Sequence, residues 1–389
     1  MLGTKFTRYL RLTGITTGIC LSIATQGFAV PVYPNGFPTD PSFFPLGVWL
    51  QSPGNAPEFK ALGINTYIGL WKGPTEDQLA ALAKNNMLVV AGQNDAALTS
   101  GNGHVLKGWL HHDEPDNAQP DGKGGYGPCI PAADVAEQSR QFKLRDPSRP
   151  VFIDFGQGVA YAGWLGRGNC TGDMAYYDTA KKNADILSFD IYPVASNQAV
   201  VQGKLEYVAF GVDNLVKRAS PDQSVWADIE TTQINSHNLV TPDQLRSEVW
   251  MALIHGATGI DYFVHEWTGG FREDGIFRHP EIVDAVTRIN QTIKALAPVL
   301  KSPNAPIRLS VTSPAISTMI KMRGNILYIF AVSLQGTGVQ ASFTLPDVKA
   351  PVASVAGENR SIALVNGKFL DTFSGYGVHR YEISLAADK

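Results

Sequence analysis

The sequence predicts an α/β fold, a (β/α)8 TIM barrel followed by a small C-terminal antiparallel β-sandwich. Between residues 46 and 300, short apolar segments rich in Val, Ile, Phe, Tyr and Trp alternate with longer segments of helical periodicity. Apolar runs of about four to eight residues are typical of strands buried on both faces, as in a parallel sheet. After Pro298 apolar and polar residues alternate between Gly, Asn and Pro turns, which favours a β-domain.

Eight apolar segments are the expected barrel strands. They are Leu46–Leu50, Asn65–Leu70, Leu88–Gln93, Gly108–Pro115, Val151–Gly158, Ile186–Pro193, Val225–Thr231 and Gly259–Trp267. Eight strands with intervening helices over about 255 residues match the usual size of a TIM barrel. A doubly wound sheet would have fewer strands, and the glycine-rich dinucleotide fingerprint of that fold follows none of these segments.

Helical patterns lie between most of these strands. The helix expected at Thr75–Asn86 opens with Thr75 followed by Gln78, the spelling of a capping box. The helix expected at Thr241–His255 opens with a cap residue followed by Pro at the first helical position. The pattern is weakest at Ala96–Lys107, which is short and contains glycine. The other expected helices are Ala56–Leu62, Ala132–Leu144, Asp173–Ala184, Leu205–Ala219 and Pro280–Leu300.

The last part of the chain is expected to form a separate β-domain over residues 303–389. Residues 303–306, Pro-Asn-Ala-Pro, are typical of a linker. Turn residues such as Gly324 and Asn325 join the expected strands of this domain. These strands are Ile307–Ser313, Ser317–Met322, Ile326–Leu334, Gln340–Leu345, Ser361–Val365 and Gly377–Ser384.

The first 29 residues have the three parts of a secretory signal. The first twelve residues carry three basic side chains and no acidic one, an apolar stretch continues to about Ala24, and Gly27 and Ala29 form a small-x-small cleavage site. The apolar stretch is shorter than the roughly 20 residues of a transmembrane helix. We therefore expect a signal peptide at 1–29, the barrel at 30–302, and a secreted or periplasmic product.

Removal of this signal leaves two cysteines, Cys129 and Cys170. An even pair in an oxidising compartment indicates one disulfide bond, with two unpaired thiols as the alternative. The net charge of −3 and the lack of basic runs argue against nucleic acid or an anionic membrane as a partner.

The active site of a TIM barrel lies at the carboxyl ends of its strands. Four of the expected strand ends carry carboxylates beside aromatic residues. Glu114 lies at the end of the fourth strand and Glu230 at the end of the seventh. Strands four and seven lie on opposite sides of an eight-stranded barrel, so we expect Glu114 and Glu230 to face each other across the mouth. Two opposed carboxyl groups over a central pocket provide an acid and a nucleophile or base.

The segment Gly108-Trp109-x-x-x-Asp113-Glu114-Pro115, with Glu230 ending strand seven, resembles the large glycoside hydrolase clan that shares a (β/α)8 barrel and paired catalytic Glu residues. The resemblance implies a retaining glycosidase with Glu114 as general acid/base and Glu230 as nucleophile. Such enzymes act on a poly- or oligosaccharide and need no cofactor. Asp113 stands where the clan usually has Asn.

The resemblance extends over roughly residues 44 to 385. Tyr192 follows strand six, where the clan often places an aromatic residue that hydrogen-bonds the nucleophile. Trp267 follows strand eight, where the clan has a platform that stacks on sugars. The ending Phe373-x-x-x-x-Val378-His379-x-Tyr381 resembles the end of the β-domain that follows many such barrels.

Further strand-end residues are expected to assist the two Glu side chains. Asp113, Asp190, Tyr192 and Asp228 are the expected supporting residues. The expected substrate-binding residues are Trp49, Trp71, Gln93, Asn94, Glu266 and Trp267. The alternative for the three Trp residues is that they fill the barrel, and Glu266 is the alternative nucleophile.

Two other classes of function remain open on the sequence. A noncatalytic carbohydrate-binding barrel would keep the aromatic residues without needing the carboxylates. A metal-dependent hydrolase would use His112, Asp113 and His265. Adjacent strand residues point to opposite faces, so His111 and His112 are not expected to share one metal ion. We expect no metal ion.

Overall fold

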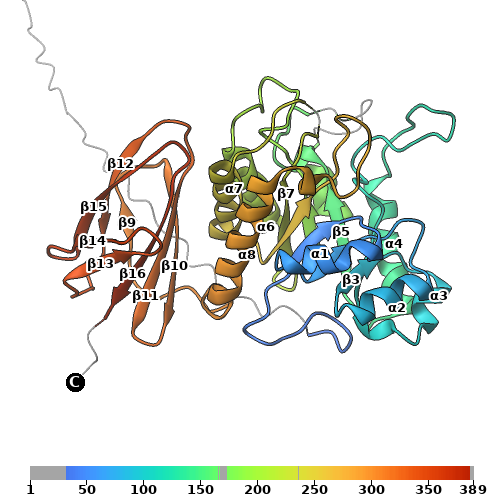
Figure 1. Cartoon of the computed structure of the whole chain (residues 1–389), viewed down its shortest axis with the longest axis horizontal. Helices are drawn as coiled ribbons and strands as arrows, with labels where there is room; N and C mark the ends of the chain where they lie inside the picture. Colours follow the sequence, from blue (N-terminus) through green and yellow to red (C-terminus); the bar gives the residue numbers. More distant parts are fainter. Residues whose placement is uncertain (1–31, 165, 167–172, 235, 386–389) are drawn as a thin grey trace, which may run out of the picture.

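The computed structural model describes residues 32–164, 166, 173–234 and 236–385. It contains a closed barrel of eight parallel strands in chain order, β1 to β8 (Figure 1). The strands are β1 Leu46–Trp49, β2 Thr66–Ile68, β3 Leu88–Ala91, β4 Leu106–Leu110, β5 Val151–Phe155, β6 Ile186–Phe189, β7 Ser224–Glu230 and β8 Gly259–Phe263. Strand β1 pairs with β8 and closes the barrel, with Gly47 opposite Asp261. The predicted TIM barrel is confirmed.

Helices alternate with the strands along the chain. They are α1 Ala56–Ala61, α2 Glu76–Lys84, α3 Asp95–Thr99, α4 Ala132–Arg145, α5 Ala175–Ala180, α6 Glu206–Arg218, α7 Pro242–His255 and α8 Pro280–Leu300. The expected capping box is present, with the hydroxyl of Thr75 accepting from the amide of Gln78. Thr241, expected as a cap residue, also forms a capping box, in which its hydroxyl accepts from the amide of Gln244. The weak third crossover is a short helix, α3, followed by a 3-10 turn at Gly103–Val105.

The side chains inside the barrel change from apolar to acidic along the strands. Six buried side chains from six strands form a cluster that we call the apolar layer: Trp49, Ile68, Val90, Phe152, Ile186 and Trp226. Gly259 makes room for it, since a Cβ there would lie 2.3 Å from the Trp226 ring. Successive residues of a strand point to opposite faces, so the next inward residue comes two positions later. Asp154 follows Phe152 in this way, and Asp228 follows Trp226.

The C-terminal part is the predicted β-sandwich. Its sheets have the orders β10-β11-β16-β13-β14 and β15-β12-β9. The strands are β9 Ser310–Val311, β10 Ile316–Arg323, β11 Ile326–Ser333, β12 Val339–Thr344, β13 Val352–Val355, β14 Arg360–Ala363, β15 Lys368–Phe373 and β16 Val378–Ser384. Phe343 and Phe369 stack in its core with ring centroids 4.6 Å apart. The prediction missed β13 and β15.

The sandwich packs against the side of the barrel formed by α7 and α8 (Figure 1). Trp250 on α7 stacks on Phe330 of β11 at 5.2 Å, and the Arg380 guanidinium lies 5.5 Å from the Trp250 ring centroid. The Ser247 hydroxyl donates to the Tyr376 carbonyl at 2.6 Å. Stacked aromatic rings and hydrogen bonds thus join the two domains.

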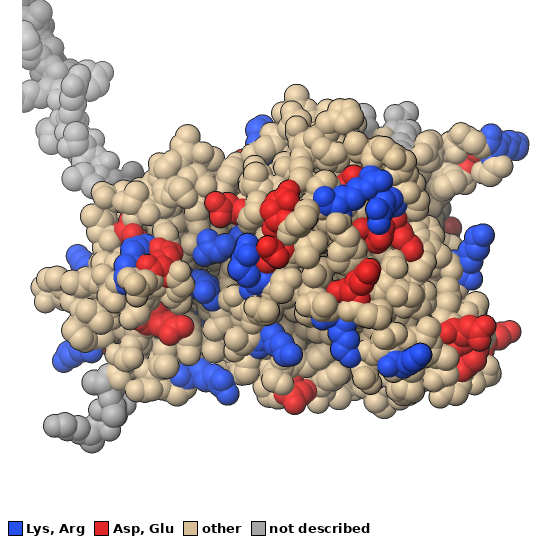
Figure 2. All heavy atoms as spheres, in the orientation of Figure 1, with Lys and Arg blue, Asp and Glu red and all other residues tan. Residues whose placement is uncertain are grey.

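Charges on the surface are mixed in sign. On the face shown in Figure 2, small groups of Lys and Arg alternate with small groups of Asp and Glu. No continuous basic area covers this face of the described residues. Within the same described part of the chain, no helix combines the length and the apolar character needed to cross a membrane.

Candidate active site

Glu114 lies in a turn four residues beyond the end of β4. Its φ is 38°, in the left-handed region that non-glycine residues rarely adopt and that is often found at functional sites. Its Oε2 accepts a hydrogen bond from Asn117 Nδ2 at 2.9 Å, and its carbonyl accepts from the Asn117 amide at 2.9 Å. The side chain is partly exposed. The turn therefore presents a carboxylate at the barrel mouth.

Gly156, directly after β5, leaves the space that Glu114 occupies. A Cβ at this position would lie 2.6 Å from Glu114 Oε1 and 3.0 Å from the Trp164 ring. The Gly156 amide donates to Asp116 Oδ1 at 2.9 Å, and the Tyr177 hydroxyl donates to Asp116 Oδ2 at 2.8 Å. Burial, and to a smaller extent the charge of Glu114, raise the pKa of Asp116 to about 7. The turn that carries Glu114 is therefore attached to the end of β5.

Three buried carboxyl groups, Asp154, Asp228 and Asp261, follow the apolar layer inside the barrel, and we call them the acidic layer. Asp228 Oδ1 accepts from the Ser188 hydroxyl at 3.0 Å. Burial raises the pKa of Asp228 to about 8. Burial, and then the charge of Asp228, raise the pKa values of Asp154 and Asp261 well above the ordinary value. Burial disfavours the ionised form of a carboxyl group, and a neighbouring negative charge disfavours it further.

Asp190 directly follows β6, between the acidic layer and the mouth. Its amide donates to the Phe155 carbonyl at 2.9 Å, and it forms a parallel bridge with Asp228. The side chain is partly exposed, but Oδ1 is buried and has no hydrogen-bond partner among the described residues. Burial first, and the charge of Glu114 second, raise the pKa of Asp190 well above its usual range. The negative charge of Glu114, on the other side of the end of β5, therefore disfavours ionisation of Asp190.

Glu230 ends β7, as predicted, but its side chain is 0% exposed. Oε1 accepts from the Val194 amide at 2.7 Å and Oε2 from the Ala195 amide at 2.6 Å. Burial raises the pKa of Glu230 to about 7. Glu248 of α7 lies beside it, and burial together with the neighbouring Glu230 charge raises the pKa of Glu248 well above its usual range. The Glu230 carboxyl thus faces the loop after β6 and α7.

Tyr192 does not make the contact that the resemblance implied. Both Glu230 oxygens accept hydrogen bonds from backbone amides, those of Val194 and Ala195. The Tyr192 ring instead packs on the Phe263 ring, with centroids 5.1 Å apart. The expected hydrogen bond between Tyr192 and Glu230 is therefore wrong for this conformation, because the loop after β6 supplies the donors instead. Tyr192 is buried beside Asp190 and the acidic layer, whose charges raise its pKa in addition to burial.

The three expected sugar-stacking Trp residues have different positions. Trp49 is only 6% exposed and belongs to the apolar layer, so it fills the barrel. Trp71 and Trp267 are 37% and 48% exposed, and Phe271, which the sequence analysis missed, is 52% exposed. The Phe271 ring centroid lies 6.1 Å from that of Trp71 and 5.7 Å from that of Trp267. We call these three residues the aromatic wall. Phe271 belongs to the loop after β8, where a rule based on strand ends gives no signal.

Three other expected substrate-binding residues have partners within the fold. Gln93 Nε2 donates to the Phe142 carbonyl at 2.9 Å. Asn94 caps α3 by accepting from the Ala97 amide, and its Nδ2 donates to the Pro74 carbonyl. Glu266 is buried and bonded to Arg278 and His279. These contacts give all three residues a structural role, and they leave Glu266 unsuited to act as a nucleophile.

His112, Asp113 and His265, the residues of the alternative metal site, do not form a cluster of ligands. His112 and Asp113 are exposed, and His265 Nε2 lies 2.9 Å from the Leu50 carbonyl. The described residues include no group of three or more His, Cys, Asp or Glu side chains arranged to hold a metal ion. Cys170 and the signal sequence lie outside the described residues, so the disulfide and the cleavage site stay predictions.

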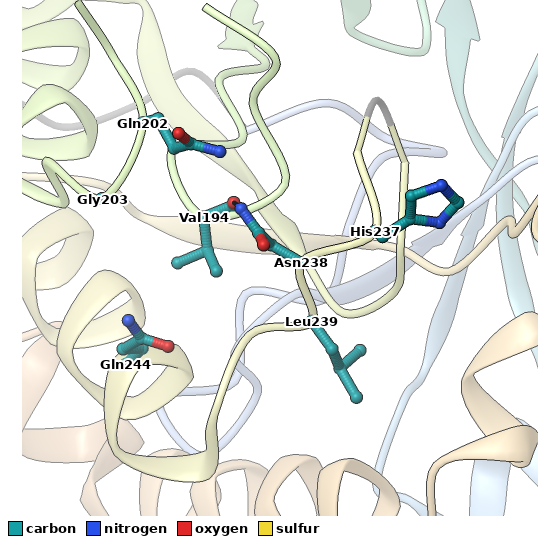
Figure 3. A pocket seen from close by; sticks show the side chains of 7 residues that line it. All are labelled: Val194, Gln202, Gly203, His237, Asn238, Leu239 and Gln244. Carbon is teal, nitrogen blue, oxygen red and sulfur yellow. Dashed lines mark hydrogen bonds between the residues drawn. The ribbon is translucent and has the colours of Figure 1, made fainter. Parts of the chain in front are cut away.

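A hollow of about 440 Å³ lies beside the loop that Glu230 holds (Figure 3). It is lined by Val194, Gln202, Gly203, His237, Asn238, Leu239 and Gln244. Asn238 Nδ2 donates to the Val194 carbonyl at 3.2 Å, so the hollow and the Glu230 contacts share one loop. These lining residues carry no carboxyl group, and the acids of the barrel mouth lie outside the hollow.

No protein-family model matches the chain, and no curated protein sequence matches it. Solved structures share its fold. AmyP in complex with maltose has a TM-score of 0.53 at 8% identity, covering 88% of this chain and 97% of that chain. The α-amylase from Geobacillus thermoleovorans in complex with acarbose has a TM-score of 0.52 at 9% identity, covering 89% and 99%. Structures with this fold therefore include glycoside hydrolases, in line with the sequence resemblance.

Proposed function

We propose that the chain is a glycoside hydrolase that cleaves O-glycosidic bonds of a poly- or oligosaccharide. The observation that carries the proposal is the pair of partly exposed acidic residues, Glu114 and Asp190, on either side of the carboxyl end of β5. Glycosidic cleavage needs one carboxyl to protonate the leaving oxygen and one carboxylate to attack or to activate water. A pair of carboxyls with different environments provides both functions.

The aromatic wall supports a sugar as the ligand class. Trp71, Trp267 and Phe271 expose large rings near the strand ends, and sugar C–H faces pack well on aromatic planes. Two proteins of the same fold were solved with maltose and with acarbose. These observations favour an oligosaccharide over a small polar substrate.

We further propose a retaining double displacement in an exported enzyme. Retaining enzymes hold their two carboxyls about 5 to 5.5 Å apart, and inverting enzymes about 6.5 to 9.5 Å. The resemblance to a clan of retaining glycosidases supports the shorter separation. Sequence analysis assigned the acid/base role to Glu114 and the nucleophile to Glu230, and the position of Asp190 makes it a second candidate partner. Export and a Cys129–Cys170 disulfide follow from the sequence of the signal and the even cysteine pair.

The test is a panel of aryl glycosides and polysaccharides incubated with purified mature protein, with and without a chelator. We expect cleavage of at least one sugar class, unchanged by the chelator and lost in Glu114→Gln. Binding without cleavage in the parent protein would instead support a carbohydrate-binding barrel. Loss of activity with the chelator would support a metal-dependent hydrolase.

A further inference from the structure

We infer that Asp190, not Glu230, is the partner of Glu114 in the reaction, with Asp190 as general acid/base and Glu114 as nucleophile. The inference rests on the proposed function and specifies its site. It reverses the role that the sequence resemblance implies for Glu114, and it gives Glu230 a positioning role.

The first argument is position. The end of β5 lies between the two carboxyl groups: Glu114 Oε1 occupies the space above Gly156, and the Asp190 amide is bonded to the Phe155 carbonyl. Both residues are partly exposed, as contact with a substrate in the mouth requires.

The second argument is that Glu114 and Asp190 have different environments, which assigns one as nucleophile and the other as proton donor. Glu114 accepts a hydrogen bond from the Asn117 amide group, and donors to a carboxylate favour its ionised form. Asp190 has a buried Oδ1 without a partner among the described residues and borders the acidic layer, so its neutral form is favoured. An ionised carboxylate is the nucleophile, and a carboxyl kept neutral is the proton donor.

The third argument is the position of Glu230. Both its oxygens are held by the Val194 and Ala195 amides, it is fully buried, and Glu248 lies beside it. Attack on a sugar would require breaking both hydrogen bonds and turning the side chain into the mouth. Those bonds instead hold the loop that follows Asp190 and Tyr192, so Glu230 positions the end of β6.

The chemistry balances with these two groups and water. In the first step a Glu114 oxygen forms a bond to the anomeric carbon, the bond from that carbon to the leaving oxygen breaks, and the leaving oxygen takes the Asp190 proton. In the second step Asp190 takes a proton from water, whose oxygen displaces Glu114 from the anomeric carbon. One water is consumed, the configuration is retained, and both carboxyls return to their starting states.

Three variants test the assignment: Asp190→Ala, Glu114→Ala and Glu230→Gln, each with aryl glycosides of good and poor leaving groups. For Asp190→Ala we expect a loss of about 10²- to 10⁴-fold on the poor leaving group, a much smaller loss on the good one, and no basic limb in the pH profile. Azide should yield a retained glycosyl azide from Asp190→Ala and an inverted one from Glu114→Ala. Glu230→Gln should stay within about tenfold of the parent.

A second measurement avoids dependence on folded variants. A 2-deoxy-2-fluoro glycoside with a dinitrophenyl leaving group, made from the sugar that the panel identifies, should trap the nucleophile of the parent protein as a covalent ester. Peptide mass mapping is expected to place the ester on Glu114. An ester on Glu230, or an inverted azide product from Glu230→Ala with an active Asp190→Ala, overturns the inference and leaves the glycosidase proposal intact. A parent protein that cleaves no glycoside contradicts both.

Discussion

Strands β5 and β7 contribute to both the apolar layer and the acidic layer, two residues apart, yet the two layers have opposite consequences for the protein. In the apolar layer, Phe152 and Trp226 are in van der Waals contact and buried, which stabilises the fold. In the acidic layer, Asp154 and Asp261 each have a buried oxygen without a hydrogen-bond partner among the described residues. Buried polar groups without partners cost free energy. Burial therefore stabilises the fold in the apolar layer and costs stability in the acidic layer.

The largest expected effect separates activity from stability at Glu114. Glu114→Gln keeps the shape and the contact with Asn117 but removes the nucleophile, so kcat should fall by at least about 10⁴-fold with little change in the melting temperature. Steady-state kinetics and thermal unfolding measure the two quantities. Glu281→Gln on the exposed surface of α8 is the matched control and should leave both unchanged.

The next largest expected effect is on stability rather than on activity. Phe152→Ala leaves a cavity in the apolar layer and should lower the free energy of unfolding by about 3 to 5 kcal/mol. The exposed Phe271→Ala in the aromatic wall should change stability little and weaken substrate binding. Urea unfolding of both variants checks the difference. Equal losses of stability would show that the layers do not differ as described.

Gly156→Ala should displace the Glu114 carboxylate and change the stability of the fold little. The added Cβ would lie 2.6 Å from Glu114 Oε1, so the carboxylate must move, and a displacement of about 1 Å can lower kcat about 10²-fold. We expect the loss in kcat rather than in KM. Gly54→Ala, where a Cβ meets nothing within 4 Å, is the control and should behave like the parent.

The smallest expected effect is the pH dependence of stability. Burial raises the pKa of Asp228 from 3.8 to about 8 and that of Glu230 from 4.5 to about 7. The folded state then binds more protons than the unfolded state between about pH 4 and pH 8, so stability is highest at the low end and declines as pH rises through this range. Melting temperatures across the range should fall, and Asp228→Asn should flatten the decline. A melting temperature that rises steadily from pH 5 to pH 8 would contradict the raised pKa values.

The sequence predicted the barrel well because its strands are buried on both faces and therefore read as apolar runs. All eight segments contain or overlap a strand, and the capping box predicted at Thr75 and Gln78 is present. The missed strand β13, Val352–Val355, is short and exposes alternate residues, with Val352 itself 43% exposed. Such a strand is defined by its neighbours β14 and β16 more than by its own composition.

The candidate site was harder to predict, because a strand end fixes where a residue lies but not where its side chain points. Glu230 shares the inward face of Trp226 and Asp228 by alternation, yet the amides of Val194 and Ala195 draw its carboxyl to another loop. The conformation of that loop has no local sequence signature. Phe271 was missed for a related reason, since a loop of irregular structure brings it to the aromatic wall.

The most direct test of the central claim, that paired carboxyls at the barrel mouth cleave a glycosidic bond by double displacement, is the anomeric configuration of the first product. Proton NMR during hydrolysis of an aryl glycoside by the parent protein should show the retained anomer first, followed by slow mutarotation. The same spectrum with Glu114→Gln should show intact substrate. The inverted anomer as first product, or equal rates for the parent and Glu114→Gln, would contradict the account.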